Sequence, residues 1–400
     1  MNIVILTGNY LPTPSPNGNI AKIIAEQLSI EGDNVYVICF DKGFIPLSDS
    51  SIKPVPITTL HRRLRYYFIE KNIPLGVKIT SLYRVGYRLI TGRTQESWYI
   101  KKALNSLKKI NNEEEIDLII SLNNPIEAHI SAIKFKEEFG TKVITYWLDQ
   151  YSDASKIHKY SLFKEKNYNN NILKEKWIHN SSNLNLITEN RVEWIKNYIG
   201  QNNYSITKYP LITKKNYSNN SNSNQINITY AGSFYKNLRE PLQLLSFFEK
   251  LNEQNVYLNV YAKGDCEETL NQFRDTKNIN IFSVKSKEEI IEIYTQSNIL
   301  INIGNSNPTQ MPSKLYEYID MGVPILNFYY SNDYEDVLRD YPYHLSIPYE
   351  RLNEYEGQII DFINKYSKMR LSKKNILSYY YEATPEYVVS KIKGNYLKNK

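Results

Sequence analysis

Short apolar runs alternate with longer amphipathic segments along most of this chain. Apolar runs bounded by turn residues are typical of strands buried on both faces, whereas apolar residues spaced three or four positions apart are typical of helices. Strands that alternate with helices predict a parallel sheet covered by helices on both faces. In the first half of the chain we expect strands at residues 3–6, 35–39, 118–121, 143–146 and 185–188. We expect helices at about residues 21–30, 97–110, 127–138 and 191–198.

Residues 213–225 interrupt this alternation. The segment is rich in Asn, Ser and Lys and has no apolar periodicity, so it is predicted to be a linker. A second alternation follows, with strands expected at residues 226–230, 256–261, 279–282, 299–303 and 325–328. The pattern predicts an α/β protein with two tandem doubly wound, Rossmann-like domains, at 1–212 and 226–375, and helices at 376–400 that pack back on the first domain. Because such sheets bind ligands beyond the carboxyl ends of their strands, we expect a site in a cleft between the domains.

The size and composition of the chain agree with this division. Its 400 residues suit two domains that each bury a core, and 42% hydrophobic and 23% charged residues are typical of globular proteins. No apolar run approaches the ~18 residues of a membrane span, and residues 1–6 are typical of a strand rather than a signal peptide, so we expect a cytoplasmic protein. Cys39 and Cys266 fall in different predicted domains and the five His are scattered, which argues against a disulfide or a zinc site. We therefore expect no metal or other cofactor.

Residues 310–326 are the stretch that points most clearly to a ligand. Ser313 can cap the start of a short helix, and Gly322 can end it in a left-handed conformation. Leu315 and Ile319 would share one face of this helix, and Glu317 would lie on roughly the opposite face. Free amides and the positive end of the helix dipole before Ser313 favour an anion, and Glu317 could accept hydrogen bonds from sugar hydroxyls. A nucleoside diphosphate needs both features, although an ordinary capped helix with a solvated Glu explains the pattern equally well.

The same stretch resembles the donor-binding signature of retaining GT-B glycosyltransferases similar to family 4, which build bacterial surface polysaccharides such as capsule and lipopolysaccharide. The resemblance rests on Pro-Ser-Lys-Leu-Tyr-Glu-Tyr at 312–318 followed by Met-Gly-Val-Pro-Ile at 321–325. It implies that Glu317 binds the ribose of a nucleotide sugar and that Ser313, Lys314 and Leu315 belong to the donor site. The family usually places a second Glu eight residues before Glu317. This chain has Thr309 there, which leaves the donor sugar open.

A second candidate for the donor site is the loop after the expected strand at 226–230. Backbone amides and cations would converge there on one anion, so a diphosphate site at Gly232, Ser233, Lys236 and Arg239 is physically reasonable. The loop resembles a Gly-loop-Lys/Arg motif of the same family, in which a basic pair contacts the diphosphate. Arg239 matches the second cation and is the first catalytic candidate, while Ser233 stands where the first Arg is usual. Lys263, just past the next expected strand, is a weaker candidate for the same phosphates.

Three further candidates follow expected strands of the first domain. Gly18 lies in a loop with three prolines, where its missing side chain would let backbone amides approach donor phosphates, as in the glycine-containing loop of the family; a plain turn is the alternative. Asp149 closes a strand at the position of an acidic residue in related enzymes, and it could equally cap a helix or turn. His129 follows a proline-containing turn and could equally be a packed helix residue. The resemblance makes Asp149 and His129 catalytic or acceptor-site candidates.

Residues 61–68 and 83–90 mix cationic and aromatic side chains. Such a surface suits an anionic bilayer, where rings lie at the headgroups and each cation contributes about 1 kcal/mol. Single-stranded nucleic acid or a packed helical insertion would also fit the composition. The resemblance favours a membrane surface, because the family often acts on polyprenyl-linked acceptors, and we expect no nucleic acid partner.

With the resemblance, these features predict a glycosyltransferase of the hexosyltransferase type. We expect it to move a sugar from a UDP-linked donor to a surface glycan or a lipid-linked acceptor, in the cytoplasm or peripherally on the inner face of the membrane. Retention at the anomeric carbon is implied by the resemblance only. Two other classes stay open: a nucleotide-sugar epimerase on the same fold, and a basic nucleic-acid-binding protein.

Overall fold

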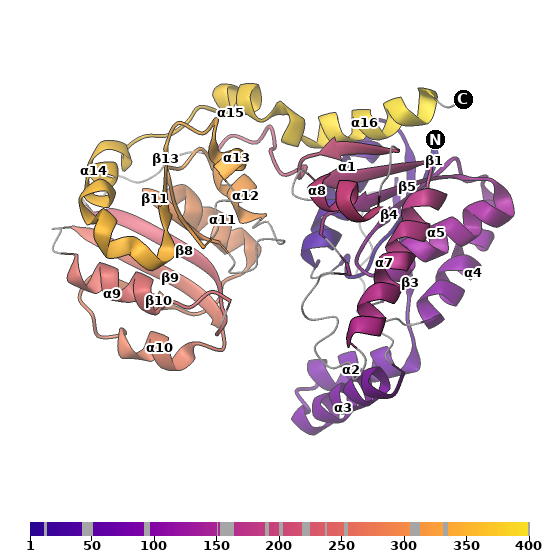
Figure 1. Cartoon of the computed structure of the whole chain (residues 1–400), viewed down its shortest axis with the longest axis horizontal. Helices are drawn as coiled ribbons and strands as arrows, with labels where there is room; N and C mark the ends of the chain where they lie inside the picture. The colour runs from indigo at the N-terminus through magenta and orange to yellow at the C-terminus, as the bar shows by residue number, and fades with distance from the viewer. Residues whose placement is uncertain are drawn as a thin grey trace. The chain divides into compact units, whose positions relative to one another are not determined.

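The protein contains two compact units, the first formed by residues 1–210 and 385–400 and the second by residues 211–384 (Figure 1). The computed structural model describes residues 1–11, 14–41, 51–91, 97–149, 151–152, 164–188, 192–199, 203–217, 225–236, 238–251, 255–304, 313–330 and 335–398. Each unit is built on its own parallel sheet and is described by itself below.

The first unit has a seven-stranded sheet in the order β3-β2-β1-β4-β5-β6-β7, and every pairing is parallel. The strands are β1 (Asn2–Leu6), β2 (Asn34–Phe40), β3 (Ile52–Ile57), β4 (Leu118–Leu122), β5 (Lys142–Trp147), β6 (Leu184–Thr188) and β7 (Tyr204–Thr207). The five strands expected from the apolar runs are confirmed. The two edge strands, β3 and β7, were not predicted.

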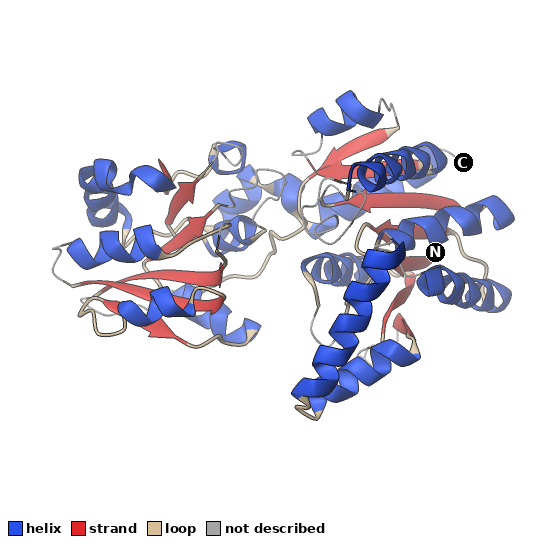
Figure 2. Ribbon diagram, turned by 60° about the horizontal axis from the view of Figure 1, so that its bottom comes forward, coloured by secondary structure: helices blue, strands red, loops and turns tan. Residues whose placement is uncertain are grey.

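Helices cover both sides of this sheet, as the side view shows (Figure 2). They are α1 (Pro16–Ile30), α2 (Leu60–Glu70), α3 (Pro74–Thr91), α4 (Ser97–Glu113), α5 (Ile126–Phe139), α7 (Lys164–Ser181), α8 (Val192–Trp194) with a π-helical turn at Ile195–Ile199, and α16 (Pro385–Lys398). The side chain of Ser15 accepts from the amide of Gly18, and Pro16 opens α1, so α1 begins earlier than expected.

The second unit has a six-stranded parallel sheet in the order β10-β9-β8-β11-β12-β13. Its strands are β8 (Ile226–Phe234), β9 (Val256–Gly264), β10 (Ile279–Phe282), β11 (Ile299–Ile303), β12 (Ile325–Tyr329) and β13 (His344–Pro348). Its helices are α9 (Leu242–Lys250), α10 (Glu267–Gln272), α11 (Lys287–Gln296), α12 (Lys314–Met321), α13 (Glu335–Leu338), α14 (Glu356–Tyr366) and α15 (Lys373–Tyr379), with 3-10 turns at Tyr349–Tyr355 and Tyr381–Ala383. The five expected strands are confirmed, and β13 was not predicted.

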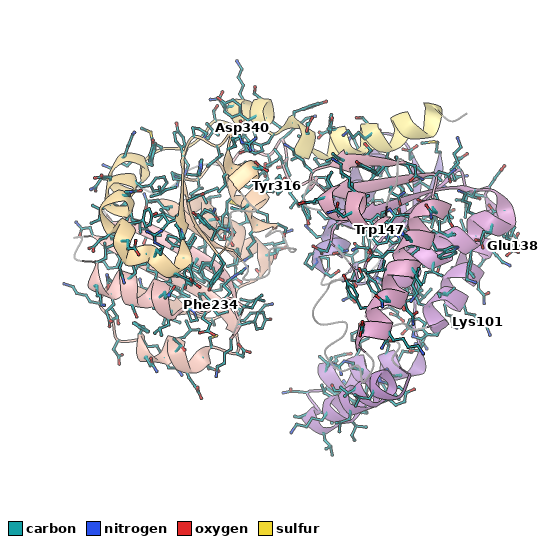
Figure 3. The ribbon with its side chains drawn as sticks, in the orientation of Figure 1. Lys101, Glu138, Trp147, Phe234, Tyr316 and Asp340 are labelled. Atoms are coloured by element: carbon teal, nitrogen blue, oxygen red, sulfur yellow. The ribbon has the colours of Figure 1, made fainter. Side chains whose placement is uncertain are left out.

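Large aromatic side chains fill the core of each unit. Trp147 lies inside the first unit and Phe234 inside the second, and both are fully buried (Figure 3). Cys39 and Cys266 are buried free thiols. Among the helices that the structure describes, none is long and apolar enough to cross a bilayer.

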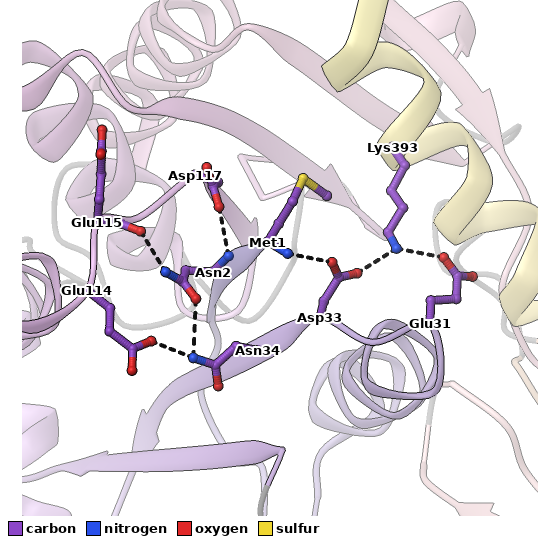
Figure 4. Close-up of polar contacts among 9 residues, drawn as sticks. All are labelled: Met1, Asn2, Glu31, Asp33, Asn34, Glu114, Glu115, Asp117 and Lys393. Carbon is purple, nitrogen blue, oxygen red and sulfur yellow. Dashed lines mark hydrogen bonds and ion pairs between the residues drawn. The ribbon is translucent and has the colours of Figure 1, made fainter.

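The last helix, α16, is held on the first unit by a small charge cluster (Figure 4). The Nζ atom of Lys393 lies 2.8 Å from Glu31 and 2.5 Å from Asp33, and Asp33 also accepts from the amino group of Met1 at 3.0 Å. Val388, Val389 and Ile392 of the same helix are fully buried. Apolar burial and ion pairing together therefore explain why the end of the chain belongs to the first unit.

In both parallel sheets the order in which successive strands are added reverses at one strand, and this switch point indicates where a ligand can bind. In the first unit β1 lies between β2 and β4, and in the second unit β8 lies between β9 and β11. In doubly wound sheets, ligands bind beyond the carboxyl ends of the strands at such a switch point. The loops that follow β1 and β4, and those that follow β8 and β11, are therefore the places to look for a site.

Candidate functional site

Arg239 reaches the switch point of the second unit. Its Nε atom lies 3.4 Å from the carbonyl oxygen of Gly304, directly after β11, and its Nη1 atom donates to the hydroxyl of Tyr230 in β8 at 3.4 Å. The turn that carries it is closed by two backbone hydrogen bonds between Tyr235 and Arg239, at 3.0 and 2.9 Å. The guanidinium is thus held between a side chain of β8 and the backbone just past the end of β11.

Gly232 makes room for this arrangement. A Cβ atom at residue 232 would lie 2.5 Å from the hydroxyl oxygen of Tyr230, the same oxygen that accepts from Arg239. Tyr230 in turn donates to the carbonyl of Ser233 at 3.3 Å. Because Tyr230 and Gly232 are two residues apart on one strand, they face the same side of the sheet. A side chain at residue 232 would therefore displace the group that positions Arg239.

Lys314 ties helix α12 to the end of β8. Its Nζ atom donates to the carbonyl oxygen of Ala231 and lies 3.5 Å from the hydroxyl of Tyr294 in α11. Burial, together with the charges of Arg239 and Lys263, lowers the pKa of Lys314 to about 8, while the carboxylate of Glu317 acts in the opposite direction. Three cations and one carboxylate therefore share one electrostatic environment at the carboxyl end of β8.

The helix that carries Glu317 agrees with the sequence in most respects. Leu315 and Ile319 are fully buried on one face, and Gly322 ends the helix in the left-handed region at φ 70°. Glu317 is half-buried, and this burial raises the pKa of its carboxyl group, while nearby Lys314 and Lys287 lower it. The carboxylate therefore lies at the edge of the core, close enough to the half-buried Lys314 to affect its pKa.

The predicted capping role of Ser313 is wrong. Ser313 has helical torsions of φ −55° and ψ −21°, and its side chain makes no capping hydrogen bond. A capping residue needs extended backbone torsions, so Ser313 is already part of the helical turn. The residues before it, which include Thr309, lie outside the described part of the chain.

Lys236 lies on the turn after β8, whereas Lys263 is inside β9 rather than just past it, because this strand continues to Gly264. In the parallel register of β8 and β9, Ser233 is paired with Lys263. Gly264 has a φ of 141°, and a Cβ there would lie 1.6 Å from the carbonyl oxygen of Phe234, so the last residues of β8 and β9 pack backbone to backbone. Lys236 is exposed, and its Nζ atom lies 3.8 Å from Glu268. Of Arg239 and these two lysines, Arg239 is the one with side-chain hydrogen bonds both to Tyr230 of β8 and to the carbonyl just past β11.

In the first unit, three loops at the switch point are joined by side-chain amides. Asn17, at the start of α1, donates to Asn123 at 2.9 Å, and Asn123 donates to the carbonyl of Asp149 at 2.7 Å. A Cβ on Gly18 would lie 1.7 Å from the carbonyl oxygen of Asn9, so the helix start packs tightly on the loop after β1. The amide of Gly18 already donates to Ser15. Sequence reasoning missed Asn17 and Asn123, although Asn123 follows β4 directly.

The two catalytic candidates of the first unit have different environments. Asp149 is half-buried just after β5, beside this amide network. His129 is fully buried in α5, with Nδ1 2.7 Å from the hydroxyl of Ser121 and its ring 4.3 Å from that of Trp147, which in turn stacks on His179. A catalytic role for either residue stays a prediction. Within the residues that the structure describes, no group of three or more His, Cys, Asp or Glu could hold a metal ion.

No family model matches this chain, and no curated protein sequence matches it. Solved structures do match. The lipopolysaccharide outer core galactosyltransferase WaaB in its apo form aligns with a TM-score of 0.62 at 10% identity, covering 100% of both chains. A sucrose-phosphate synthase from Thermosynechococcus elongatus aligns at 0.67 and 10% identity, covering 99% of this chain and 98% of the other. A UDP-GlcNAc 2-epimerase from Methanocaldococcus jannaschii aligns at 0.60 and 9% identity, covering 98% and 99%.

At such low identity the likeness shows the fold alone. The chain has the GT-B fold, two doubly wound α/β domains each built on a parallel sheet, as the resemblance of residues 312–325 implied. Solved structures with this fold include both glycosyltransferases and epimerases that act on UDP-GlcNAc.

Proposed function

We propose that the protein is a retaining hexosyltransferase that moves a sugar from a UDP-linked donor to a surface glycan or a lipid-linked acceptor. The observation that carries this proposal is the charge cluster at the switch point of the second unit, where Arg239, Lys263 and Glu317 all act on the pKa of Lys314. A nucleoside diphosphate offers two phosphates to cations and a ribose to a carboxylate, so it matches the cluster in both charge and hydrogen bonding.

In this proposal Arg239 acts on the leaving group. Breaking the bond between the sugar and the diphosphate leaves negative charge on the phosphate oxygens, and a guanidinium can hold two of those oxygens at once. Arg239 is suited to this task because the Gly304 carbonyl and the Tyr230 hydroxyl already fix its orientation. A preorganised cation of this kind stabilises the transition state more than the bound donor. Lys236 and Lys263 would add charge at the outer phosphate, so no metal ion is required.

Glu317 is assigned to the ribose. It lies one helical turn after Ser313, so its carboxylate can accept from ribose hydroxyls while the phosphates lie towards Gly232. Ser313 and Leu315 complete the donor side of this helix. A carboxylate that accepts two hydroxyl hydrogen bonds contributes both affinity and orientation.

The first unit would bind the acceptor. Its switch point carries Asp149 and the Asn17–Asn123 network, which offer polar groups to sugar hydroxyls. Gly18 brings the start of α1 close to the loop after β1. We assign Asp149 to the acceptor hydroxyl, and His129 to supporting it from the interior through Ser121 and Trp147. A lipid-linked acceptor would place the enzyme in the cytoplasm, at the inner face of the membrane.

A nucleotide-sugar epimerase is the second candidate, because an epimerase shares the fold over nearly the whole chain. Incubation with the nucleotide sugar alone separates the two functions. An epimerase would convert the donor into an isomer without any acceptor, whereas a glycosyltransferase would leave it unchanged or release free nucleotide slowly.

The proposal is tested first by donor binding. Ligands that bind only the folded state raise the melting temperature, with about 2.7 kcal/mol of stabilisation at a hundred times the dissociation constant. We expect a uridine nucleotide sugar to raise it, and Arg239→Ala and Glu317→Ala to reduce the shift. Lys277→Ala, an exposed cation before β10, is the matched control. If no nucleotide or nucleotide sugar in a broad panel changes the melting temperature, the donor assignment is wrong.

A further inference from the structure

Helices α2 and α3 form a hairpin that packs mainly through polar and small residues on α3. The Nε2 atom of His61 lies 3.2 Å from the carbonyl oxygen of Thr80, and Arg65 donates to the hydroxyl of Ser81 at 2.7 Å. Phe68 fills the space above Gly76, where a Cβ would lie 2.4 Å from its ring. Figure 1 shows the two helices side by side, below the strands of the first unit.

The opposite face of α3 is apolar and exposed. Leu75, Ile79 and Leu82 are 69%, 57% and 69% exposed. Their spacing of four and seven residues from Leu75 places them on one stripe of the helix. Tyr83 is 61% exposed and lies at the edge of this face, because its ring also packs on His61 of α2 at 4.8 Å between ring centres. The hairpin therefore has the reverse of the usual distribution, in which the apolar stripe of a surface helix faces the core. Four more large hydrophobic side chains nearby are also more than a third exposed: Leu64, Tyr67, Ile69 and Ile73.

The hairpin also concentrates positive charge. Residues 60–91 hold seven Lys or Arg and a single acidic residue, Glu70, which gives a net charge of +6, against +7 for all 400 residues. Arg63, Lys71 and Lys78 are exposed on it. Apolar side chains flanked by cations are the composition of helices that lie in the interface of an anionic bilayer.

Three basic side chains of residues 61–68 are half-buried and make contacts within the protein. Arg62 stacks on Phe40, with its guanidinium 3.6 Å from the ring centre, and so joins the hairpin to the sheet. His61 and Arg65 are used between α2 and α3. The surface that can meet a partner is therefore the outer face of α3 with the exposed cations. The side chains of Arg84 and Arg88, and all of Arg93, lie outside the described part of the chain.

We propose that the α2–α3 hairpin docks on an anionic lipid bilayer, with Leu75, Ile79, Leu82 and Tyr83 in the headgroup and acyl boundary. Arg63, Lys71 and Lys78 would contact lipid phosphates. Charge decides between this partner and a second copy of the chain, since pairing two hairpins would bring +6 against +6. A bilayer with phosphatidylglycerol offers both the apolar layer and the opposite charge. The proposal does not depend on the glycosyltransferase assignment, because docking requires neither donor nor acceptor.

The test is sedimentation of the whole protein with vesicles of phosphatidylcholine, alone or mixed with phosphatidylglycerol. We expect binding to the mixed vesicles that weakens with salt. The combined variant Leu75→Ser, Ile79→Ser and Leu82→Ser should lower the partition coefficient by more than about tenfold. Replacing Arg63, Lys71 and Lys78 by Gln should lower it about fivefold per cation at low salt and much less at high salt.

Matched controls distinguish a loss of docking at the hairpin from a general effect of making any surface less apolar or less charged. The apolar control replaces Ile30, Leu173 and Val284 by Ser; these residues belong to other parts of the chain than the hairpin and are 78%, 64% and 54% exposed. The charge control replaces the exposed Lys277, Lys368 and Lys374 by Gln. Both controls should bind vesicles as the wild type does, and the melting temperatures of all variants verify folding. Three results would each overturn the proposal: equal recovery with neutral and anionic vesicles, unchanged binding of the Ser variant, or a wild-type dimer that becomes monomeric in the Ser variant.

Discussion

Lys314 should make donor binding depend on pH. Its ammonium group is buried against the carbonyl of Ala231, and its pKa is about 8 instead of the 10.5 of an exposed lysine, chiefly because of burial and then because of Arg239 and Lys263. A diphosphate bound among these cations would supply negative charge and raise that pKa again. Binding should therefore take up a proton once the pH passes about 8.

The size of the effect follows from the shift. Between pH 7 and pH 9, free Lys314 changes from mostly charged to mostly neutral, whereas in the complex it would stay charged if its pKa returned to 10.5. Each pH unit above 8 then weakens binding by up to tenfold, so affinity should fall about tenfold from pH 7 to pH 9. The folding stability of the unliganded protein should change with pH in the opposite direction to donor affinity. The unfolded chain binds this proton more tightly between pH 8 and 10.5, so Lys314 makes stability rise with pH in that window.

Titration calorimetry with UDP, in two buffers of different ionisation enthalpy, measures the proton uptake directly. In Lys314→Met the uptake near pH 8 should disappear, while any titration of UDP itself remains and serves as the internal reference. Lys277→Met, at an exposed site, should behave as the wild type does. The reasoning is refuted if the wild type binds UDP without proton uptake between pH 8 and 9, or if Lys314→Met retains it.

Substitutions at three further residues test other parts of the structure. Arg239→Ala should lower turnover by about a hundredfold or more at saturating donor, and Arg239→Lys should recover only part of this loss, as measured by steady-state kinetics. If both variants stay within about twofold of wild-type turnover, the diphosphate must instead be assigned to Lys236 or Lys263. Glu317→Ala should weaken donor binding by about 1.5–3 kcal/mol without unfolding the protein, and wild-type affinity by calorimetry would disprove the ribose assignment. Lys393→Met leaves the nearly buried Asp33 with one cationic partner and should cost about 2 kcal/mol in urea unfolding, whereas the exposed Lys374→Met should cost almost nothing.

The central strands of both sheets could be predicted because they are buried on both faces and read as continuous apolar runs. The edge strands could not. Strand β3 contains Pro54 and Pro56, which argue against a strand, yet proline is tolerated at a sheet edge where its missing amide has no partner to lose. Strand β7 is short and largely polar, and β13 begins at His344 and ends at Pro348. In the described part of the chain, each of these strands pairs only with the strand before it and is open on its other side, so it lacks the continuous apolar run of a central strand.

The candidate site divides in the same way. Local backbone chemistry was readable: Gly322 ends its helix in the left-handed region, and Leu315 and Ile319 form the buried face. The hydrogen-bond partners of Arg239 could not be predicted from the sequence. Tyr230 contacts Arg239 only because β8 continues past residue 230 and Gly232 leaves space beside its hydroxyl. Asn123 was overlooked because Asn is so common in this chain that a single one carries little weight.

Helix α12 is fixed at both ends, and this links the candidate donor site to the segments through which the chain enters and leaves the second unit. At its start, Lys314 holds the end of β8. Near its end, the buried carboxylate of Asp320 accepts from the amide and hydroxyl of Thr213 at 2.7 and 2.9 Å, from Tyr217 at 3.2 Å and from Lys373 at 2.7 Å. Thr213 and Tyr217 belong to the stretch just after the first unit ends, and Lys373 begins α15, which leads back towards it. All these groups bind the one buried carboxylate of Asp320, so a shift of α12 would strain both connecting segments. A ligand that moved Glu317 would therefore also act on the segments that join the two units.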